Sequence, residues 1–342
     1  MVGIGIIGIG KMGGFHAEWI AKTEGLRLVA VCDKNAQRVE EFRKKYGAEG
    51  YTDVDAFLGA KGMDWVAIIT TNDVHELLTV KVLQKKKNVI VEKPMSLTYE
   101  STLRMIATAE QYGRRILVHH SSRWDRDFLL VQELIRAGTL GEILMIQSKV
   151  MLCDAGWPAW GIEGMANPWR IKAQYGGGIL LDWGPHLVDQ FLVLMGKDPI
   201  GVYGILQSGV WSSEVDDYFF ADLRFEGKTI CQIEVGNNAR ISAPRWYIIG
   251  SRGTLEVKGK SDPVWDEAEI RYIRTDGKRE IQRIQMTGVC ESGLEGGFYT
   301  DLVPYLNGEK KPYATMYEAA KTVKLLDLVR LSSKEGRFVE YR

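Results

Sequence analysis

The 342-residue sequence is poor in the residues that build metal centres and redox pairs. It has only four cysteines and five histidines. The cysteines show none of the short spacings of a zinc site or a redox motif; they are Cys32, Cys153, Cys231 and Cys290. We therefore predict no metal site. A chain of this size needs no disulfides to fold, and dispersed thiols are typical of a reducing cytoplasm.

The sequence also lacks an excess of either charge and lacks long apolar runs. Its 44 basic residues balance its 44 acidic residues, so there is no electrostatic reason to expect a nucleic acid or an anionic membrane as partner. No stretch approaches the ~18 apolar residues of a membrane span. Met1–Gly14 is apolar, but it has no basic leader and is interrupted by glycines, which does not favour a signal peptide. We expect a cytoplasmic protein.

The first third of the chain alternates strand and helix patterns. Its predicted strands are continuous apolar runs, as expected of strands buried on both faces. They are Val2–Ile7, Leu26–Cys32, Trp65–Thr70, Asn88–Val91 and Ile116–His119. Charged helical stretches such as Asn35–Tyr46 separate them. This alternation predicts an α/β domain over residues 1–121 with a doubly wound parallel sheet.

The pattern changes after about residue 120. Successive short strands with turn signals fill Ile200–Met286, and such runs usually pair antiparallel. The other predicted elements are helices at Phe128–Ala137, Pro185–Leu194, Leu294–Leu306 and Met316–Ser333, and a strand at Glu142–Met151. We predict a second α/β domain over residues 122–342 with a large, predominantly antiparallel sheet. Its broad face favours self-association into a homodimer or homotetramer.

A glycine-rich turn directly follows the first predicted strand and opens a helix. Its sequence is Gly8-Ile9-Gly10-Lys11-Met12-Gly13, the spacing of a dinucleotide-binding Rossmann turn. The helix N-terminus behind it offers N–H groups to a pyrophosphate. Asp33 ends the second strand, where a carboxylate binds the ribose hydroxyls or, alternatively, caps the next helix. A carboxylate repels a 2′-phosphate, which favours NAD over NADP, although Lys34 and Arg38 offset that repulsion in part.

Four segments together resemble the Gfo/Idh/MocA family of oxidoreductases, and the resemblance covers essentially the whole chain. They are the glycine turn, Thr71-Asn72-Asp73-Val74-His75, Val89-Ile90-Val91-Glu92-Lys93-Pro94, and Gly176-Gly-Gly-Ile-Leu-Leu-Asp182-Trp-Gly-Pro-His186-Leu-Val-Asp189. The segment His119-His120-Ser121-Ser122-Arg123-Trp124 departs from the more usual Asn-Arg pairing of that family. We assign no catalytic role to its histidines.

The resemblance implies a dehydrogenase or reductase that transfers a hydride between a nicotinamide and a hydroxyl carbon of a sugar, sugar derivative or cyclic polyol. It implies that Lys93 contacts the reacting hydroxyl, that His186 transfers the proton, and that Asp182 supports both. The bond between Lys93 and Pro94 is cis in relatives. Asp182 and His186 share a helix face at their four-residue spacing, while Asp182 is also a candidate N-cap near the helix start.

The predicted binding residues fall into two sets. The predicted cofactor contacts are Gly8, Gly10, Lys11, Met12, Gly13, Asp33, Arg38, Thr71, Asn72, His75, Glu92 and Lys93. The predicted substrate contacts are Trp157, Trp169, Arg170, Tyr175 and Tyr299, because aromatic faces pack on sugar C–H surfaces and arginine donates to hydroxyls. The tryptophans are equally well explained as core or interface residues. Two other functions stay open, namely a redox-neutral NAD-dependent glycosidase of the same family and a non-catalytic sensor.

Overall fold

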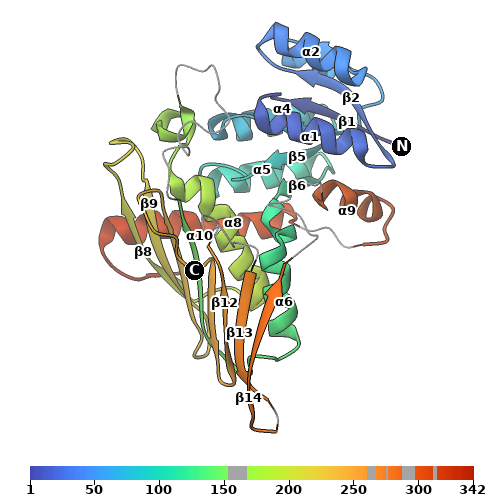
Figure 1. Ribbon diagram of the computed structural model, residues 1–342. Coiled ribbons are helices and arrows are strands. Elements are labelled where there is room, and N and C mark those ends of the chain that lie inside the picture. Colours follow the sequence, from blue (N-terminus) through green and yellow to red (C-terminus); the bar gives the residue numbers. More distant parts are fainter. Residues whose placement is uncertain (153–167, 260–266, 275, 287–296, 311–313) are drawn as a thin grey trace. The chain divides into compact units, whose positions relative to one another are not determined.

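The chain divides into two compact units, seen here in a computed structural model (Figure 1). The structure describes residues 1–342 except 153–167, 260–266, 275, 287–296 and 311–313. Unit 1 comprises Met1–Ser121 and the described residues of Gly293–Val323. Unit 2 comprises the described residues of Ser122–Trp160 and Pro168–Ser292, together with Lys324–Arg342.

Unit 1 is built on a six-stranded parallel sheet. Its strands are β1 (Val2–Ile7), β2 (Leu26–Cys32), β3 (Glu49–Tyr51), β4 (Trp65–Ile68), β5 (Asn88–Glu92) and β6 (Ile116–His119). They lie in the order β3-β2-β1-β4-β5-β6, with every described neighbouring pair parallel. This is the strand order of a dinucleotide-binding Rossmann fold, and it confirms the predicted parallel sheet.

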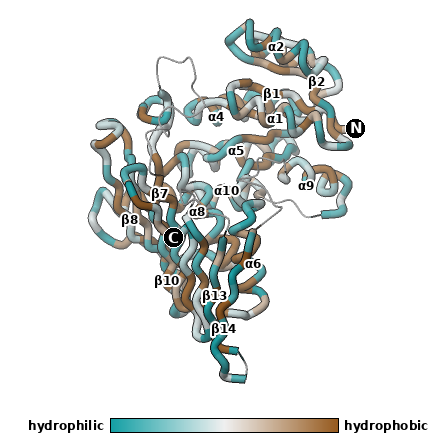
Figure 2. Tube along the Cα trace, viewed as in Figure 1, coloured by the Kyte–Doolittle hydropathy of each residue, from teal (hydrophilic) through white to brown (hydrophobic). Residues whose placement is uncertain are grey.

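Helices connect and cover the strands of unit 1. They are α1 (Lys11–Lys22), α2 (Ala36–Tyr46), α3 (Val54–Leu58), α4 (His75–Gln84), α5 (Tyr99–Gln111) and α9 (Gly297–Leu306), with the 3-10 turn η1 (Asn72–Val74). A second 3-10 turn, η2 (Ser121–Trp124), begins at the last residue of Met1–Ser121 and otherwise belongs to unit 2. The strands are almost wholly apolar because both faces of the sheet are covered. Only Val39 of α2 is buried, and most of this helix is hydrophilic in Figure 2.

The C-terminal helix α10 (Met316–Glu335) accounts for the difference between these units and the predicted division at residue 121/122. Its residues Met316, Ala319, Ala320 and Val323 belong to the same hydrophobic cluster as the strands and helices of unit 1. The carbonyl of Ala314, just before the helix, accepts a hydrogen bond from the N–H of Val118 in β6. Burial of the first two turns of α10 therefore places residues up to Val323 in unit 1. Sequence order alone does not indicate that a C-terminal segment belongs to the N-terminal unit.

Unit 2 contains a larger sheet. Its strands are β7 (Ile143–Met151), β8 (Gly201–Gln207), β9 (Tyr218–Arg224), β10 (Ile230–Gly236), β11 (Trp246–Gly250), β12 (Gly253–Val257), β13 (Glu267–Ile273), β14 (Arg279–Gln285) and β15 (Val339–Glu340). Among the described strands the order is β14-β13-β12-β11-β7-β10-β9-β8-β15. The pair β7–β10 is parallel and the other described pairs are antiparallel. The prediction of a large, mostly antiparallel sheet is therefore confirmed.

The helices of unit 2 include α6 (Arg126–Arg136) and α8 (Ile179–Met195), with 3-10 turns η3 (Trp169–Ile171) and η4 (Ala173–Tyr175). Helix α8 begins at Ile179, earlier than predicted, and its N-cap is Gly178. The prediction of Asp182 as an N-cap is therefore wrong. Asp216 satisfies the free N–H groups instead, since its backbone oxygen accepts from Ile179 and its carboxylate accepts from Leu180 at 2.6 Å.

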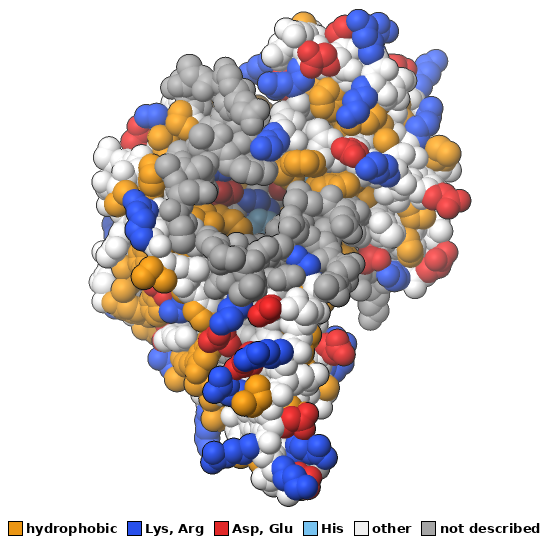
Figure 3. Space-filling model, in the orientation of Figure 1, with side chains coloured by type: hydrophobic (Ala, Val, Ile, Leu, Met, Phe, Trp, Pro, Cys, Tyr) orange, Lys and Arg blue, Asp and Glu red, His pale blue; other side chains and the backbone are white. Residues whose placement is uncertain are grey.

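Charged side chains of both signs are interspersed over the face of the molecule shown in Figure 3. This matches the even overall balance of acidic and basic residues. Among the described residues, no helix is both long enough and apolar enough to cross a membrane.

Candidate functional site

The glycine turn between β1 and α1 has the geometry of a phosphate-binding turn. Gly8 has a φ of +89°, and a Cβ there would lie 2.2 Å from the carbonyl oxygen of Ile69. A Cβ on Gly13 would lie 2.2 Å from the carbonyl oxygen of Gly8. A Cβ on Gly10, in contrast, would meet nothing within 4 Å in the described part of the chain. Gly8 and Gly13 are thus required by the fold, whereas Gly10 leaves its backbone open to a pyrophosphate at the helix N-terminus, so the turn fits a dinucleotide.

Asp33 lies at the end of β2, beside the glycine turn. One carboxylate oxygen accepts from the backbone N–H of Ile9 at 3.0 Å, and the other accepts from Asn35 at 2.9 Å. Arg38 lies 3.5 Å from the same carboxylate. The N-cap of α2 is Asn35, whose side chain accepts from the N–H of Arg38. The capping alternative for Asp33 is therefore removed, and its carboxylate is fixed next to the turn that would hold the pyrophosphate.

The segment after β4 supports the loop that carries Lys93. His75 is completely buried, and its Nδ1 donates to the carbonyl of Pro94 at 2.9 Å. Burial lowers the pKa of His75, which favours the neutral ring. Asn72 is also buried, Thr71 is half-buried, and the bond between Lys93 and Pro94 is cis. The contact that the structure gives His75 is to the loop, and its predicted contact with a cofactor remains a prediction.

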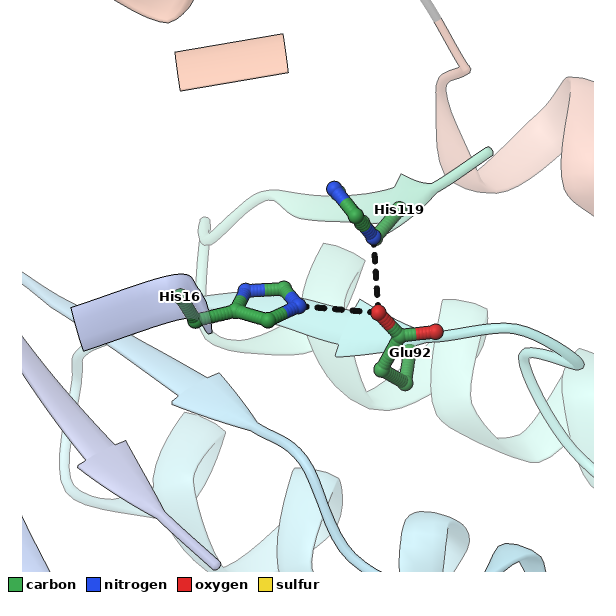
Figure 4. A group of neighbouring side chains, drawn as sticks. All are labelled: His16, Glu92 and His119. Atoms are coloured by element: carbon green, nitrogen blue, oxygen red, sulfur yellow. Dashed lines mark hydrogen bonds and ion pairs between the residues drawn. The ribbon is translucent and has the colours of Figure 1, made fainter. Parts of the chain in front are cut away.

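Glu92 is the centre of a buried group of polar side chains (Figure 4). Its Oε1 lies 2.9 Å from His16 Nε2 and 2.7 Å from His119 Nδ1, and its Oε2 accepts from the backbone N–H of Lys93 at 3.0 Å. The hydroxyl of Tyr299 lies 2.7 Å from His16 Nδ1. Glu92 is only 7% exposed, and His16 and Tyr299 are completely buried. We call Glu92, His16, His119 and Tyr299 the Glu92 network.

Burial and hydrogen bonding shift the pKa values of three members of this network, namely His16, Glu92 and Tyr299. Burial, reinforced by the charge of His119, lowers the pKa of His16 to about 4, so this ring is neutral at pH 7. Burial alone would raise the pKa of Glu92, but the charge of His119 and the hydrogen bonds from both histidines hold it well below its usual range. Burial raises the pKa of Tyr299 well above its usual range. An ionised carboxylate only accepts, so His16 donates from Nε2 to Glu92 and accepts at Nδ1 from Tyr299.

Helix α8 carries the other predicted catalytic residues. Asp182 and His186 are four residues apart within the helix and therefore share one face. The carboxylate of Asp182 accepts from Arg170 Nε at 3.2 Å. The imidazole Nδ1 of His186 lies 3.0 Å from the hydroxyl of Ser122. Both candidate residues are thus oriented by neighbours within unit 2.

Ser122 and Arg123 belong to a buried polar layer under His186. Gln190 donates to the carbonyl of Ser122 at 2.8 Å. Arg123 makes a two-pronged ion pair with Asp189, with distances of 2.6 and 2.7 Å. These contacts fix the chain around Ser122, and therefore the hydroxyl that orients His186.

The predicted substrate residues have different surroundings. Arg170 is buried, with its guanidinium 4.5 Å from the centre of the Trp169 ring. Trp169 and Tyr175 are half-buried, and Trp157 lies outside the described residues. Tyr299 is completely buried and its hydroxyl faces His16, so a substrate cannot reach it. We therefore reassign Tyr299 to the Glu92 network. Lys11 is exposed, and Met12, Arg38 and Lys93 are half-buried.

Sequence reasoning missed several residues that the structure brings to these sites. They are His16, His119, Ser122, Arg123, Asp189, Gln190 and Asp216. Ser122 and Arg123 lie in the segment after β6 that departs from the family pattern. That departure indicated that this segment differs from its relatives, and it could have drawn attention to both residues. His16 and Glu92 are 76 residues apart, and nothing local to either one indicates the pair.

Comparison with known proteins gives a consistent result along the chain. Residues 2–120 match the model described as the Gfo/Idh/MocA oxidoreductase family with an NAD-binding Rossmann fold, and residues 128–256 match the family's C-terminal domain. The scyllo-inositol 2-dehydrogenase (NADP(+)) of Bacillus subtilis is 28% identical over 98% of this chain and 95% of its own. The myo-inositol 2-dehydrogenase of Thermotoga maritima is 28% identical over 74% of each chain.

A solved structure of an NAD-binding protein from Listeria innocua agrees over nearly the whole length. It superposes with a TM-score of 0.84 at 29% identity, covering 99% of this chain and 96% of its own. The two family matches together span more than half of the sequence and include the glycine turn, Lys93 and His186. The chain therefore belongs to the Gfo/Idh/MocA family of NAD(P)-dependent oxidoreductases.

Proposed function

We propose that the protein is an NAD-preferring dehydrogenase of a ring hydroxyl on a sugar, a sugar derivative or a cyclic polyol such as an inositol, acting as a homodimer or homotetramer. The observation that carries this proposal is the position of Lys93. It directly follows β5, at the carboxyl edge of the sheet where the glycine turn follows β1. Ligands of parallel α/β sheets bind at that edge. The inositol dehydrogenases among the relatives support the substrate class.

The glycine turn and Asp33 would hold the dinucleotide, with Gly10 next to the pyrophosphate and the Asp33 carboxylate on the ribose hydroxyls. Bound NAD would supply the two-electron acceptor for the carbon that is oxidised. Asp33 is already anchored by two backbone N–H groups, so its negative charge stays in place against a 2′-phosphate. This geometry supports NAD over NADP.

The chain's own polar residues would handle the hydroxyl and its proton. The Lys93 ammonium donates to the substrate oxygen, and His186 accepts the hydroxyl proton at Nε2. Ser122 is 3.0 Å from His186 Nδ1, and in the tautomer that we propose its hydroxyl accepts the N–H of that atom, which leaves Nε2 free of a proton. Asp182, held by Arg170, places its negative charge on the His186 face of α8, where it favours the protonated imidazole.

The test is the absorbance of reduced nicotinamide with purified protein, using NAD and NADP in turn with inositols, hexoses, glycosides and sugar acids. Turnover of a polyol or sugar with a preference for NAD would support the proposal and identify the substrate class. Glycoside cleavage with no net nicotinamide reduction would replace it with the redox-neutral glycosidase. Absence of any reaction, with cofactor binding intact, would favour the sensor.

The variant Gly10→Ala is expected to weaken NADH binding by at least ~10-fold while leaving the thermal midpoint of unfolding unchanged. Its Cβ meets no described protein atom within 4 Å and projects where the pyrophosphate approaches. NADH fluorescence titration and thermal unfolding measure the two effects. Gly13→Ala is the matched comparison, because its Cβ would overlap the Gly8 carbonyl and it should lower the unfolding midpoint. Unchanged NADH affinity in Gly10→Ala would contradict the assignment of the turn.

The variant Ser122→Ala is expected to lower kcat by about 10-fold, because a neutral imidazole without its orienting partner divides between two tautomers and more orientations. Steady-state kinetics on the substrate found in the screen measure this effect. Ser122→Thr keeps the hydroxyl and should retain most activity. Equal losses in the alanine and threonine variants would mean that the hydroxyl does not orient His186.

A further inference from the structure

Lys93 is flanked by two residues that buried histidines hold in place. His16 and His119 contact the carboxylate of Glu92, and His75 donates to the carbonyl of Pro94. Three of the five histidines in the chain are thus used around this single tripeptide. Neither the cofactor-binding turn nor the proton transfer assigned to His186 requires any of them.

The direction of the strands explains how these side chains meet. Alternate side chains of a strand point to opposite faces of the sheet. In β5, Val89 and Val91 pack in the hydrophobic cluster that includes α4 and α5. Glu92 points to the other face, where α1 supplies His16 (Figure 4). His119 ends the neighbouring strand β6 and is paired with Glu92 in the sheet register. The Glu92 carboxylate is therefore held by one helix and one strand besides its own.

A buried carboxylate is costly unless hydrogen bonds satisfy it. Here Oε1 accepts from two imidazoles, at 2.9 and 2.7 Å, and Oε2 accepts from the N–H of Lys93 at 3.0 Å. The hydroxyl of Tyr299 in turn donates to His16 and fixes its tautomer. Both oxygens of the carboxylate are therefore bonded, which holds Glu92 rigidly, and one of these bonds comes from the backbone of Lys93.

We propose that the Glu92 network is a positioning device that fixes the Lys93 backbone so that its side chain reaches the reacting hydroxyl. This inference rests on the proposed function of Lys93. Glu92, His16, His119 and Tyr299 are positioning residues in it, because they act through Lys93. Errors of about 1 Å in the placement of a reacting group cost on the order of 10²-fold in rate, which makes a rigid support effective.

His16, Glu92 and His119 also have the composition of a metal triad. One observation favours hydrogen bonding over metal binding. Both imidazole nitrogens approach the same carboxylate oxygen, at 2.9 and 2.7 Å, which are hydrogen-bond distances (Figure 4). Metal content is therefore part of the test.

The experiment compares Glu92→Gln, His16→Leu, His16→Gln and Tyr299→Phe with the wild type, by kcat and by NADH affinity from fluorescence titration. We expect Glu92→Gln and His16→Leu to lower kcat by about 10²-fold. In His16→Leu the Kd for NADH should change less than about 3-fold, because His16 is not among the predicted cofactor contacts, whereas Glu92 is. His16→Gln restores an N–H donor for Glu92 and should recover most of kcat. Tyr299→Phe should lower kcat by about 5-fold, because it removes only the outer bond of the network.

Tyr305→Phe is the matched control for loss of a tyrosine hydroxyl. Tyr305 lies on the same helix, α9, and its hydroxyl accepts a hydrogen bond from the exposed guanidinium of Arg115 at 3.1 Å. This variant should keep the wild-type kcat. Three results would overturn the proposal, namely a kcat within 2-fold of wild type in Glu92→Gln and His16→Leu, no recovery in His16→Gln, or one equivalent of bound metal in the purified protein.

A second measurement separates this inference from the proposed function. The rate at which acetic anhydride labels Lys93 is followed by peptide mass spectrometry on the protein without substrate, with exposed Lys85 as the internal reference. We expect the Lys93 rate to change by at least about 5-fold in Glu92→Gln and in Tyr299→Phe, relative to Lys85. If the wild type oxidises no sugar or polyol, the proposed function fails. The labelling rates still decide whether the Glu92 network positions Lys93, because they require no substrate. Equal Lys93 rates in all variants would disprove the positioning role.

Discussion

Lys93→Met is expected to lower kcat by about 10²–10³-fold, the loss measured when one hydrogen-bond donor to a reacting oxygen is removed. Methionine keeps the length and most of the volume of the lysine chain but cannot donate. Lys93 is half-buried at the carboxyl edge of the sheet, so a methionine is accommodated there and the fold should be unaffected. Steady-state kinetics and NADH titration on the same preparation measure chemistry and cofactor binding separately.

Lys85→Met is the matched control for this prediction. Lys85 is exposed just after α4 and contributes to neither the glycine turn nor the loop of Lys93. We expect its kcat and its NADH affinity to equal those of the wild type. If Lys93→Met kept a kcat within tenfold of wild type, Lys93 would not be the donor to the substrate oxygen. If it lost NADH affinity in proportion to kcat, Lys93 would belong to the cofactor site instead.

The parallel sheet could be predicted closely because five of its six strands are apolar runs that can be recognised locally. The observed β1, β2 and β6 have the predicted bounds, and β5 extends one residue further, to Glu92. Strand β3 was missed because Glu-Gly-Tyr is too short and too polar to form an apolar run. The start of α8 was placed too late for a different reason. The residue that satisfies its first N–H groups, Asp216, comes from a loop 36 residues downstream of Leu180.

The candidate residues were predictable only where a motif is continuous in sequence. The glycine turn, the Glu-Lys-Pro segment and the pair Asp182 and His186 are of this kind. The partners that orient them are not, because each comes from a distant part of the chain. Tyr299 and His16 are 283 residues apart, and Ser122 and His186 are 64 residues apart. Such pairs are set by strand order and helix packing, which local periodicity does not determine.

Asp189→Asn is expected to reduce the free energy of unfolding of the protein by about 3–5 kcal/mol. The carboxylate of Asp189 is 2% exposed and makes two hydrogen bonds to the guanidinium of Arg123, whose side chain is 8% exposed. Asparagine keeps the shape but removes the negative charge that both of these hydrogen bonds from the buried guanidinium meet. Urea unfolding of the whole protein, followed by tryptophan fluorescence, measures the change.

The double variant Arg123→Met/Asp189→Leu separates charge from packing in this prediction. It removes both charges and fills similar volume, so it should recover most of the stability that Asp189→Asn loses, because buried ion pairs are often replaceable by apolar residues. Asp276→Asn is the surface comparison, since Asp276 is 3.5 Å from Arg274 with both side chains about half exposed. It should change the free energy of unfolding by less than about 1 kcal/mol.

Two outcomes would contradict the prediction. Either Asp189→Asn lowers the free energy of unfolding no more than Asp276→Asn does, or the double variant is no more stable than Asp189→Asn. In both cases the ion pair would not be what stabilises the polar layer under His186.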